Sequence, residues 1–245
     1  MISVHSLIKS YNGFQAVDRL SFEVAPGEIL GLVGPNGAGK TTTLRCLCGI
    51  IPATGGGIRI GGVDLDQDPI AAKKILAFVP DEPYLFEYLT VWDHLMLFSK
   101  LYGVEDGVGR AAELLGDNGL SDQKFAYPTE LSRGMKQKLI IACALLHSPR
   151  ALVLDEPLTG LDPGAIRRTK RTILQTAEQG AAVIVSSHML HVVEEICSRI
   201  LILQSGQKVL EGSLNEIRGN LPEIDEEADL EEIFMRATGL GDPSE

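Results

Sequence analysis

The chain has 245 residues, of which 44% are hydrophobic and 22% are charged, an ordinary composition for a globular protein of one large or two small domains. Its formal net charge of −11 disfavours sequence-independent binding to DNA or RNA, so we expect no nucleic-acid partner. The longest uninterrupted apolar run, 139–146, is far shorter than the roughly 20 residues of a spanning helix. We therefore expect the chain not to cross a membrane by itself.

The cysteines favour a reduced environment. Cys46, Cys48, Cys143 and Cys197 are present, and none of them forms a C-x-x-C pair. The spacing of Cys46 and Cys48 suits neither a disulfide nor a zinc site, so a cytosolic protein is the simplest interpretation. Residues 1–10 lack a long apolar core, and we expect no signal peptide.

Strand-like segments alternate with helix-like segments along the chain. We expect strands at residues 2–7, 20–24, 28–33, 58–60, 75–79, 151–154, 181–185 and 200–203. We expect helices at residues 41–48, 90–101 with Thr90 as N-cap, 110–115, 135–146, 167–179 and 191–197. Such alternation predicts a mainly parallel sheet covered on both faces, which is the α/β class.

One segment interrupts the alternation. Pro80 and Pro83 follow the strand at 75–79 and end it. The residues after these prolines read as mainly helical until the next buried strand approaches. We therefore predict a helical subdomain at about 81–134, inserted between parts of the sheet.

The C-terminal part differs in composition. Seven of the ten residues 223–232 are acidic. Apolar residues then recur at i, i+3, i+4 and i+7, namely Leu230, Ile233, Phe234 and Ala237. We predict a domain at 1–220, then an acidic linker and a short amphipathic helix at 221–245 that stops at Gly239. A partly disordered tail is the alternative.

A glycine-rich loop follows the expected strand at 28–33. Residues 34–41, Gly-Pro-Asn-Gly-Ala-Gly-Lys-Thr, fit the pattern G-x-x-x-x-G-K-[ST]. Such a loop aims backbone N–H groups and a helix dipole at phosphate, Lys40 supplies a cation, and the Thr41 hydroxyl can ligate Mg²⁺. Chance produces the pattern in on the order of one chain in a hundred. The strand–loop–helix context nevertheless favours a nucleotide site.

Two acids end the expected strand at 151–154. A parallel strand delivers Asp155 and Glu156 to the carboxyl edge of the sheet, where ligands bind in open α/β folds. Asp155 would hold Mg²⁺ or its waters, and Glu156 would orient or deprotonate an attacking water. Acidic residues often follow strands, so this pair alone is a weak signal. It indicates a catalytic site because the phosphate loop is present in the same chain.

Together these motifs resemble those of the ATP-binding-cassette (ABC) family. Residues 34–42 resemble its Walker A motif, and residues 152–156 its Walker B motif with the catalytic glutamate. Residues 131–135, Leu-Ser-Arg-Gly-Met, stand where the family has its LSGGQ signature. The D-loop, the switch histidine and the aromatic residue that stacks on adenine are matched by Asp162, His188 and Tyr11. The resemblance covers roughly residues 1–212.

The resemblance implies a fold, ligands and residue roles. The fold is a P-loop NTPase with a mainly parallel sheet, an N-terminal antiparallel β subdomain and a helical subdomain. The implied catalytic residues are Glu156, His188, Lys40 and Asp81. The implied contacts to ATP are Tyr11, Val17, Asn36, Gly37, Ala38, Gly39, Lys40, Thr41, Thr42, Ser132 and Gly134. The implied Mg²⁺ ligands are Thr41, Asp155 and Asp81.

The resemblance also implies that one chain forms half of each site. Two ATP-binding subunits, in a homodimer or a heterodimer, face each other, and the signature of one covers ATP on the other. The Ser132 hydroxyl and the Gly134 N–H would contact that γ-phosphate, and Asp162 would contact the opposing subunit. The plainer alternatives are a turn residue for Asp162, a structural histidine for His188, and a core or surface aromatic for Tyr11.

Two positions depart from the family pattern. Asp81 stands where the family usually has glutamine, and Arg133 stands where its signature usually has glycine. A carboxylate can approach Mg²⁺ but would repel γ-phosphate without the metal, so we hypothesise that Asp81 is a metal-dependent sensor. For Arg133, a phosphate contact and a solvent-facing position remain equal alternatives. Met135 replaces the last glutamine of the signature and weakens any polar contact to ribose.

An aromatic-rich segment follows Asp81. It contains Tyr84, Phe86, Tyr88 and Trp92. In the family the corresponding region contacts a coupling helix of the membrane subunit, and aromatics suit such a groove. Internal packing of the helical subdomain is the alternative. The resemblance thus implies a separate transmembrane permease and a peripheral location on the cytoplasmic face of the cell membrane.

The sequence resembles the stand-alone motor subunits of bacterial ABC-2-type exporters most, through its signature and the ending at 230–234. An import system is the alternative direction of transport. A soluble ABC ATPase acting on a ribosome or chromosome is the main alternative. The single cassette, the acidic charge and the lack of sustained heptads count against it. A degenerate regulatory nucleotide binder is a third possibility, which the intact Lys40, Asp155, Glu156 and His188 oppose.

Overall fold

The computed structural model describes residues 1–220 and 228–239 of the chain. The strands are β1 (Ile2–Tyr11), β2 (Phe14–Val24), β3 (Ile29–Val33), β4 (Gly55–Ile60), β5 (Val63–Asp64), β6 (Leu76–Val79), β7 (Ala151–Asp155), β8 (Ala182–Ser186), β9 (Arg199–Gln204) and β10 (Gln207–Gly212). The α-helices are α1 (Lys40–Leu47), α2 (Pro69–Lys74), α3 (Val91–Tyr102), α4 (Gly107–Asp117), α5 (Arg133–Leu145), α6 (Pro163–Glu178), α7 (Leu190–Ile196), α8 (Leu214–Asn220) and α9 (Leu230–Thr238). Within the described residues, no helix has the length and apolarity that a bilayer crossing requires.

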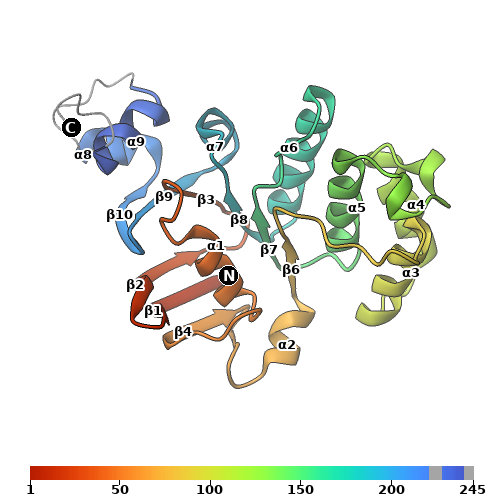
Figure 1. The fold of residues 1–245 in the computed structure, drawn as a ribbon, viewed down its shortest axis with the longest axis horizontal. Helices are drawn as coiled ribbons and strands as arrows, with labels where there is room; N and C mark the ends of the chain where they lie inside the picture. The colour runs from red at the N-terminus through yellow and green to blue at the C-terminus, as the bar shows by residue number, and fades with distance from the viewer. Residues whose placement is uncertain (221–227, 240–245) are drawn as a thin grey trace.

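A six-stranded sheet forms the centre of the molecule, in the order β10-β9-β3-β8-β7-β6 (Figure 1). The pairs from β9 to β6 are parallel, and β10 joins β9 antiparallel at one edge. Every residue of β3, β7 and β8 is buried, because helices cover one face of the sheet, and α1 with the antiparallel sheet covers the other. The prediction of a mainly parallel sheet is confirmed.

A second, antiparallel sheet of four strands, β2-β1-β4-β5, contains the N-terminus (Figure 1). Its first hairpin turns at Asn12 and Gly13, which both adopt positive φ, as the tight turns that suit twisted strands require. Leu7 and Val17 of this sheet share a buried core with Leu44 of α1. The expected N-terminal antiparallel subdomain is therefore present beside the phosphate loop.

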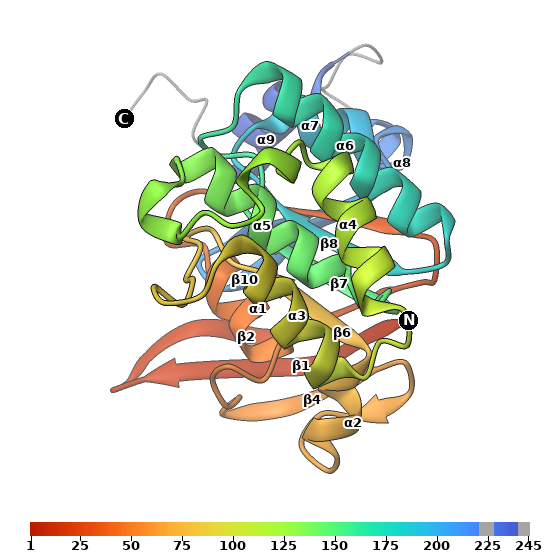
Figure 2. The ribbon, with the colours of Figure 1, turned by 90° about the vertical axis from the view of Figure 1, so that its right-hand side faces the viewer.

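Helices α3, α4 and α5 form a layer against the edge of the main sheet near β6 and β7 (Figure 2). Leu95, Leu114 and Leu139, one from each helix, belong to a single buried cluster. Thr90 caps α3 as predicted, because its hydroxyl accepts from the backbone N–H of Asp93. Helices α3 and α4 lie within residues 81–134, for which a helical subdomain was predicted, whereas nearly all of α5 lies beyond them.

Several element boundaries differ from the sequence prediction. Helix α6 begins at Pro163 rather than near residue 167, because Asp162 accepts from the backbone N–H of Ala165 and Pro163 suits a first helical turn. Strand β10 and helices α2 and α8 were not predicted from their mixed composition. Helix α9 lies where the short C-terminal helix was predicted, and it ends at Thr238 with Gly239 as its C-cap. Most of the acidic linker lies outside the described residues.

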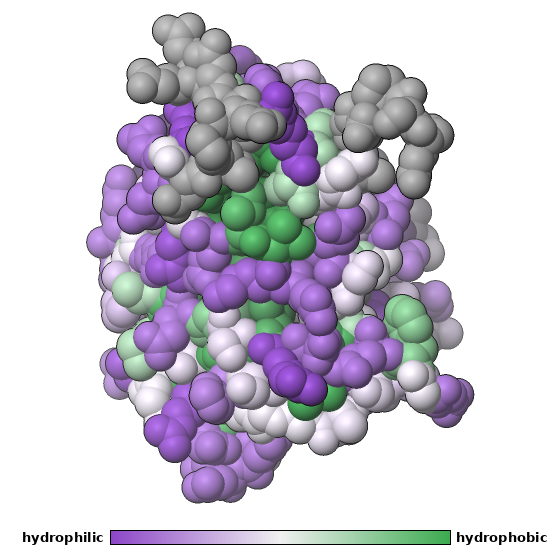
Figure 3. Space-filling view, turned by 90° about the vertical axis from the view of Figure 1, so that its left-hand side faces the viewer, coloured by the Kyte–Doolittle hydropathy of each residue, from purple (hydrophilic) through white to green (hydrophobic). Residues whose placement is uncertain are grey.

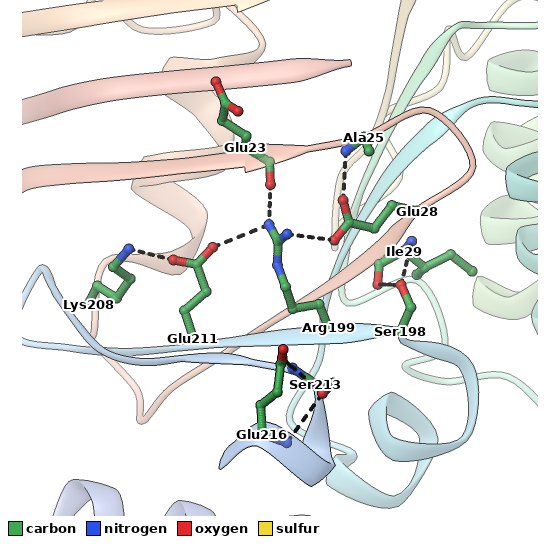
Figure 4. Close-up of polar contacts among 10 residues, drawn as sticks. All are labelled: Glu23, Ala25, Glu28, Ile29, Ser198, Arg199, Lys208, Glu211, Ser213 and Glu216. Atoms are coloured by element: carbon green, nitrogen blue, oxygen red, sulfur yellow. Dashed lines mark hydrogen bonds and ion pairs between the residues drawn. The ribbon is translucent and has the colours of Figure 1, made fainter. Parts of the chain in front are cut away.

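Arg199 ties the two sheets together (Figure 4). Its guanidinium lies 3.0 Å from a carboxylate oxygen of Glu28 and 3.2 Å from one of Glu211, and it donates to the carbonyl oxygen of Glu23. Glu23 belongs to β2 of the antiparallel sheet, whereas Glu211 belongs to β10 of the main sheet. One cation therefore joins both sheets at this edge.

We expect Arg199→Met to lower the free energy of unfolding by about 1–3 kcal/mol, measured by urea titration. The substitution keeps most of the apolar stem but leaves Glu28 and Glu211, with side chains 15% and 20% exposed, without their shared cation. Arg59→Met is the control, because Arg59 is 64% exposed and its partner Asp64 lies 3.8 Å away. It should change stability by less than about 0.5 kcal/mol. Equal losses in both variants would show that the Arg199 contacts contribute nothing specific.

Candidate functional site

A pocket of about 550 Å³ lies at the carboxyl edge of the main sheet. Its lining includes Tyr11, Phe14, Ala16, Asn36, Gly37, Ala38, Gly39, Lys40, Thr41, Thr42, Asp81, Arg133, Asp155, Glu156, Thr159 and His188. Asp81 follows β6, Glu156 follows β7 and His188 follows β8, so the parallel strands bring these side chains to one edge. Segments far apart in the sequence thus line one pocket.

The glycine loop between β3 and α1 is shaped by positions that exclude a side chain. A Cβ at Gly34 would lie 2.3 Å from the carbonyl oxygen of Leu203, and one at Gly39 would lie 2.5 Å from that of Ala16. Gly39 also has φ +102°, which an L side chain strains. The loop therefore wraps tightly against its neighbours and turns its backbone towards the pocket.

Lys40 begins α1 and folds back over this loop. Its Nζ donates to the carbonyl oxygens of Gly34 at 2.6 Å and Pro35 at 3.2 Å. Burial lowers the pKa of Lys40, while the nearby carboxylates of Glu156 and Asp155 act in the opposite direction. A bound phosphate would give this partly desolvated ammonium a charged partner in place of neutral carbonyls.

Asp155 is the most buried acid of the pocket, at 3% exposure. The hydroxyl of Ser186 donates to its Oδ1 at 2.5 Å and so fixes its orientation. Thr41 lines the same pocket. A carboxylate and a hydroxyl are the hard oxygen donors that Mg²⁺ prefers, with phosphate oxygens and water completing its shell. The chemistry of Thr41 and Asp155 therefore suits Mg²⁺, and Asp81, the third predicted ligand, lines the same pocket.

Glu156 and His188 are in direct contact. The distance between Glu156 Oε2 and His188 Nδ1 is 2.8 Å, and the backbone N–H of His188 donates to the same oxygen at 3.3 Å. Glu156 has φ +50°, and its own N–H donates to the carbonyl oxygen of Ser186 at 3.1 Å. Burial raises the pKa of Glu156, and the contacts with His188 and the charge of Lys40 partly offset that rise. Such a carboxylate is suited to accept a proton.

Two aromatic side chains stand at the pocket on the β1–β2 hairpin. Tyr11 was predicted there and is 44% exposed, with Lys9 Nζ 4.8 Å from its ring centre. Phe14, which pairs with Tyr11 across the turn, is 67% exposed and was not predicted. Val17 is fully buried and does not line the pocket, whereas Ala16 does. The aromatic pair offers flat apolar surface of the kind that a base can stack on.

Two residues of the signature segment, Ser132 and Gly134, lie apart from this pocket, although Arg133 between them lines it. Ser132 is exposed at the start of α5, where its hydroxyl accepts from the backbone N–H of Met135 at 3.2 Å. Gly134 packs beside the loop before α6, since a Cβ there would lie 3.3 Å from the carbonyl oxygen of Gly160. Asp162 is also exposed, and its cap to Ala165 lowers its pKa. Neither Ser132 nor Gly134 contributes to the nucleotide pocket of its own chain.

Comparisons with known proteins agree with this geometry. Residues 17–159 match the ABC transporter family. The chain is 33% identical to ABC-type transporter ATP-binding protein EcsA of Bacillus subtilis (strain 168), over 97% of this chain and 96% of that protein. It is 38% identical to Nod factor export ATP-binding protein I of Paraburkholderia xenovorans (strain LB400), over 84% of this chain and 68% of that protein.

A solved structure of an ATP-binding subunit of an ABC transporter superposes on the chain with a TM-score of 0.92 at 32% identity, covering 97% of this chain and 99% of that one. The similarity therefore extends through both sheets and the helical layer. The chain belongs to the ABC transporter family, as an ATP-binding ATPase subunit with the P-loop NTPase fold.

Proposed function

We propose that this ATPase subunit powers a separate membrane permease, in the direction of export, by closing on a second ATP-binding subunit around Mg²⁺-ATP. The observation that carries the proposal is the division of the motifs between two surfaces. Lys40, Asp155, Glu156 and His188 meet in one pocket, whereas Ser132 stands exposed outside it. A pocket that lacks the signature residues Ser132 and Gly134 of its own chain needs them from another copy.

The chain's own residues have distinct tasks in hydrolysis. The glycine-loop N–H groups and Lys40 hold the phosphates, and Tyr11 with Phe14 supports the base. Thr41 and Asp155 would hold Mg²⁺, which when bound neutralises phosphate charge. Asp81 lies at the pocket wall, where the metal-sensing role proposed for it can be tested. Glu156 accepts a proton from the attacking water, and His188 holds the Glu156 carboxylate in place.

We expect the ATPase rate to fall as the pH drops through the raised pKa of Glu156, because the protonated carboxyl cannot accept a proton. His188→Ala should move this acid limb to higher pH, since it removes contacts that lower the pKa of Glu156. Steady-state rates of both proteins from pH 5 to pH 9 supply the measurement, a range of about 4 units that spans the titration of a perturbed carboxyl. If His188→Ala lowers the ATPase rate but leaves the acid limb of the pH profile at the same pH, His188 acts on the phosphate rather than on Glu156.

The segment after β6 supports a membrane partner. Tyr84, Phe86 and Tyr88 are 78%, 59% and 89% exposed, and Tyr84 and Phe86 line a groove of about 310 Å³ beside α3 and α5. Trp92 instead packs inside the helical layer, with Lys124 Nζ 3.6 Å from its ring centre. Figure 3 shows the side of the molecule away from α3 and α5, where hydrophilic side chains divide the apolar surface into separate areas. Because Tyr84 and Phe86 are exposed and line an open groove, we propose that groove as the contact for a coupling helix of the permease.

We expect Tyr84→Ser with Tyr88→Ser to remove a polytopic membrane protein that co-purifies with the tagged chain from detergent-solubilised membranes. Both side chains are exposed, so the isolated ATPase rate should stay within about twofold of wild type. Ile70→Ser is the control, because Ile70 is 71% exposed on α2. Co-purification of rRNA or DNA in place of a membrane protein would favour the ribosome or chromosome alternative.

The direction of transport rests on similarity. One relative is named for the export of Nod factor, and the signature of this chain resembles that of exporter motor subunits. We propose export on these grounds, with the subunit held at the cytoplasmic face of the membrane by its permease. ATP-dependent accumulation of a cargo inside native cells, lost on inactivation of this subunit, would contradict the proposed direction.

A further inference from the structure

The two positions that depart from the family pattern lie next to each other in space. Arg133 is the first residue of α5, and its Nη2 lies 3.6 Å from Oδ1 of Asp81, which follows β6. Both side chains line the nucleotide pocket and are more than half exposed, at 58% and 52%. The arginine of the signature segment therefore points back to the pocket of its own chain.

A second contact places the Arg133 stem. A Cβ on Gly160 would lie 3.3 Å from Cδ of Arg133 and 3.4 Å from its Nε. Gly160 has φ +77°, and without a side chain it leaves room for the arginine to cross the loop before α6. The Arg133 side chain thus crosses the loop before α6 and reaches the loop after β6, and these contacts restrict the positions that its guanidinium can occupy.

The charges of the pocket explain why this pairing matters. Asp81, Asp155 and Glu156 line it together with the cations Lys40 and Arg133. Where the family has a neutral amide and a glycine, this chain has one extra negative and one extra positive charge. Without Arg133, the carboxylate of Asp81 would face an incoming triphosphate with its charge uncompensated.

We propose that Arg133 is a positioning residue that acts through Asp81 of the same chain: it offsets and orients that carboxylate so that the triphosphate can enter. The inference rests on the nucleotide-binding function proposed for this pocket. An ion pair this exposed is weak and screened by salt. It can therefore orient the Asp81 carboxylate and still leave it free to bind Mg²⁺.

The test is a double-mutant cycle on ATP affinity, read with a fluorescent ATP analogue in the presence of Mg²⁺ and again with the metal chelated. Arg133→Gln should raise Kd by about three- to tenfold, with the larger effect in the absence of Mg²⁺. In an Asp81→Asn background the same substitution should change Kd by less than about twofold, because no unpaired carboxylate remains. Arg133→Lys should retain near wild-type affinity.

Lys100→Gln is the matched control, since it removes an exposed cation from α3 and leaves the pocket lining intact. A Kd that rises equally in both Asp81 backgrounds would overturn the proposal, because Arg133 would then act on phosphate directly. An unchanged Kd in Arg133→Gln would overturn it as well. Wild-type protein that fails to bind the analogue would instead refute the nucleotide site itself, which separates the two failures.

Discussion

Glu156→Gln should lower the ATPase rate by at least ~100-fold while ATP affinity stays within about threefold of wild type. Glutamine matches the shape of glutamate, and its amide oxygen can still accept from the backbone N–H of His188. It cannot take a proton from water at neutral pH. The chemical step should therefore stop with ATP bound, and size-exclusion chromatography with Mg²⁺-ATP should show a trapped dimer.

Glu178→Gln is the matched control for this experiment. Glu178 is the last residue of α6, is exposed, and is remote from the pocket lining, so its rate should stay within about twofold of wild type. If Glu156→Gln keeps more than about one tenth of the wild-type ATPase rate, another group performs the proton transfer. A monomer in the presence of Mg²⁺-ATP would contradict nucleotide-driven closure.

The pocket could be predicted because its chemistry is local in the sequence. Lys40 and Thr41 adjoin the glycine loop, and Asp155 and Glu156 end a buried strand, so each pair comes with its structural context. Parallel strands then deliver separate motifs to one edge without any further information. Phe14 escaped prediction because its place depends on the twist of a hairpin, which brings it opposite Tyr11.

The contact between Arg133 and Asp81 could not be predicted from the sequence. Each residue stood out as a departure from the family pattern, but their proximity depends on how α5 packs beside the loop after β6. A single sequence carries no signal for that packing. Similarly, α6 starts at Pro163 because the Asp162 cap outweighs the Pro163-Gly164 pair, which is typical of a turn in a sequence.

Lys40→Ala and Ser132→Asp should each lower the ATPase rate by at least ~100-fold, and mixing the two variants should restore activity that neither has alone. Lys40→Ala removes the phosphate-facing cation. Ser132→Asp retains a side chain able to cap α5 but places a negative charge where the opposing γ-phosphate is expected. A mixed dimer contains one site with an intact Lys40 and an intact Ser132, because the two residues of a site come from different chains.

Ser132→Asn separates charge from structure in this experiment, since asparagine also caps helices and carries no charge. Its rate should fall far less than that of Ser132→Asp. If the mixture stays inactive although dimers form with ATP, Lys40 and Ser132 act within the same chain, and the composite site is wrong. If mixing restores activity, the exposed position of Ser132 in the single chain is explained: its ligand is bound to the partner.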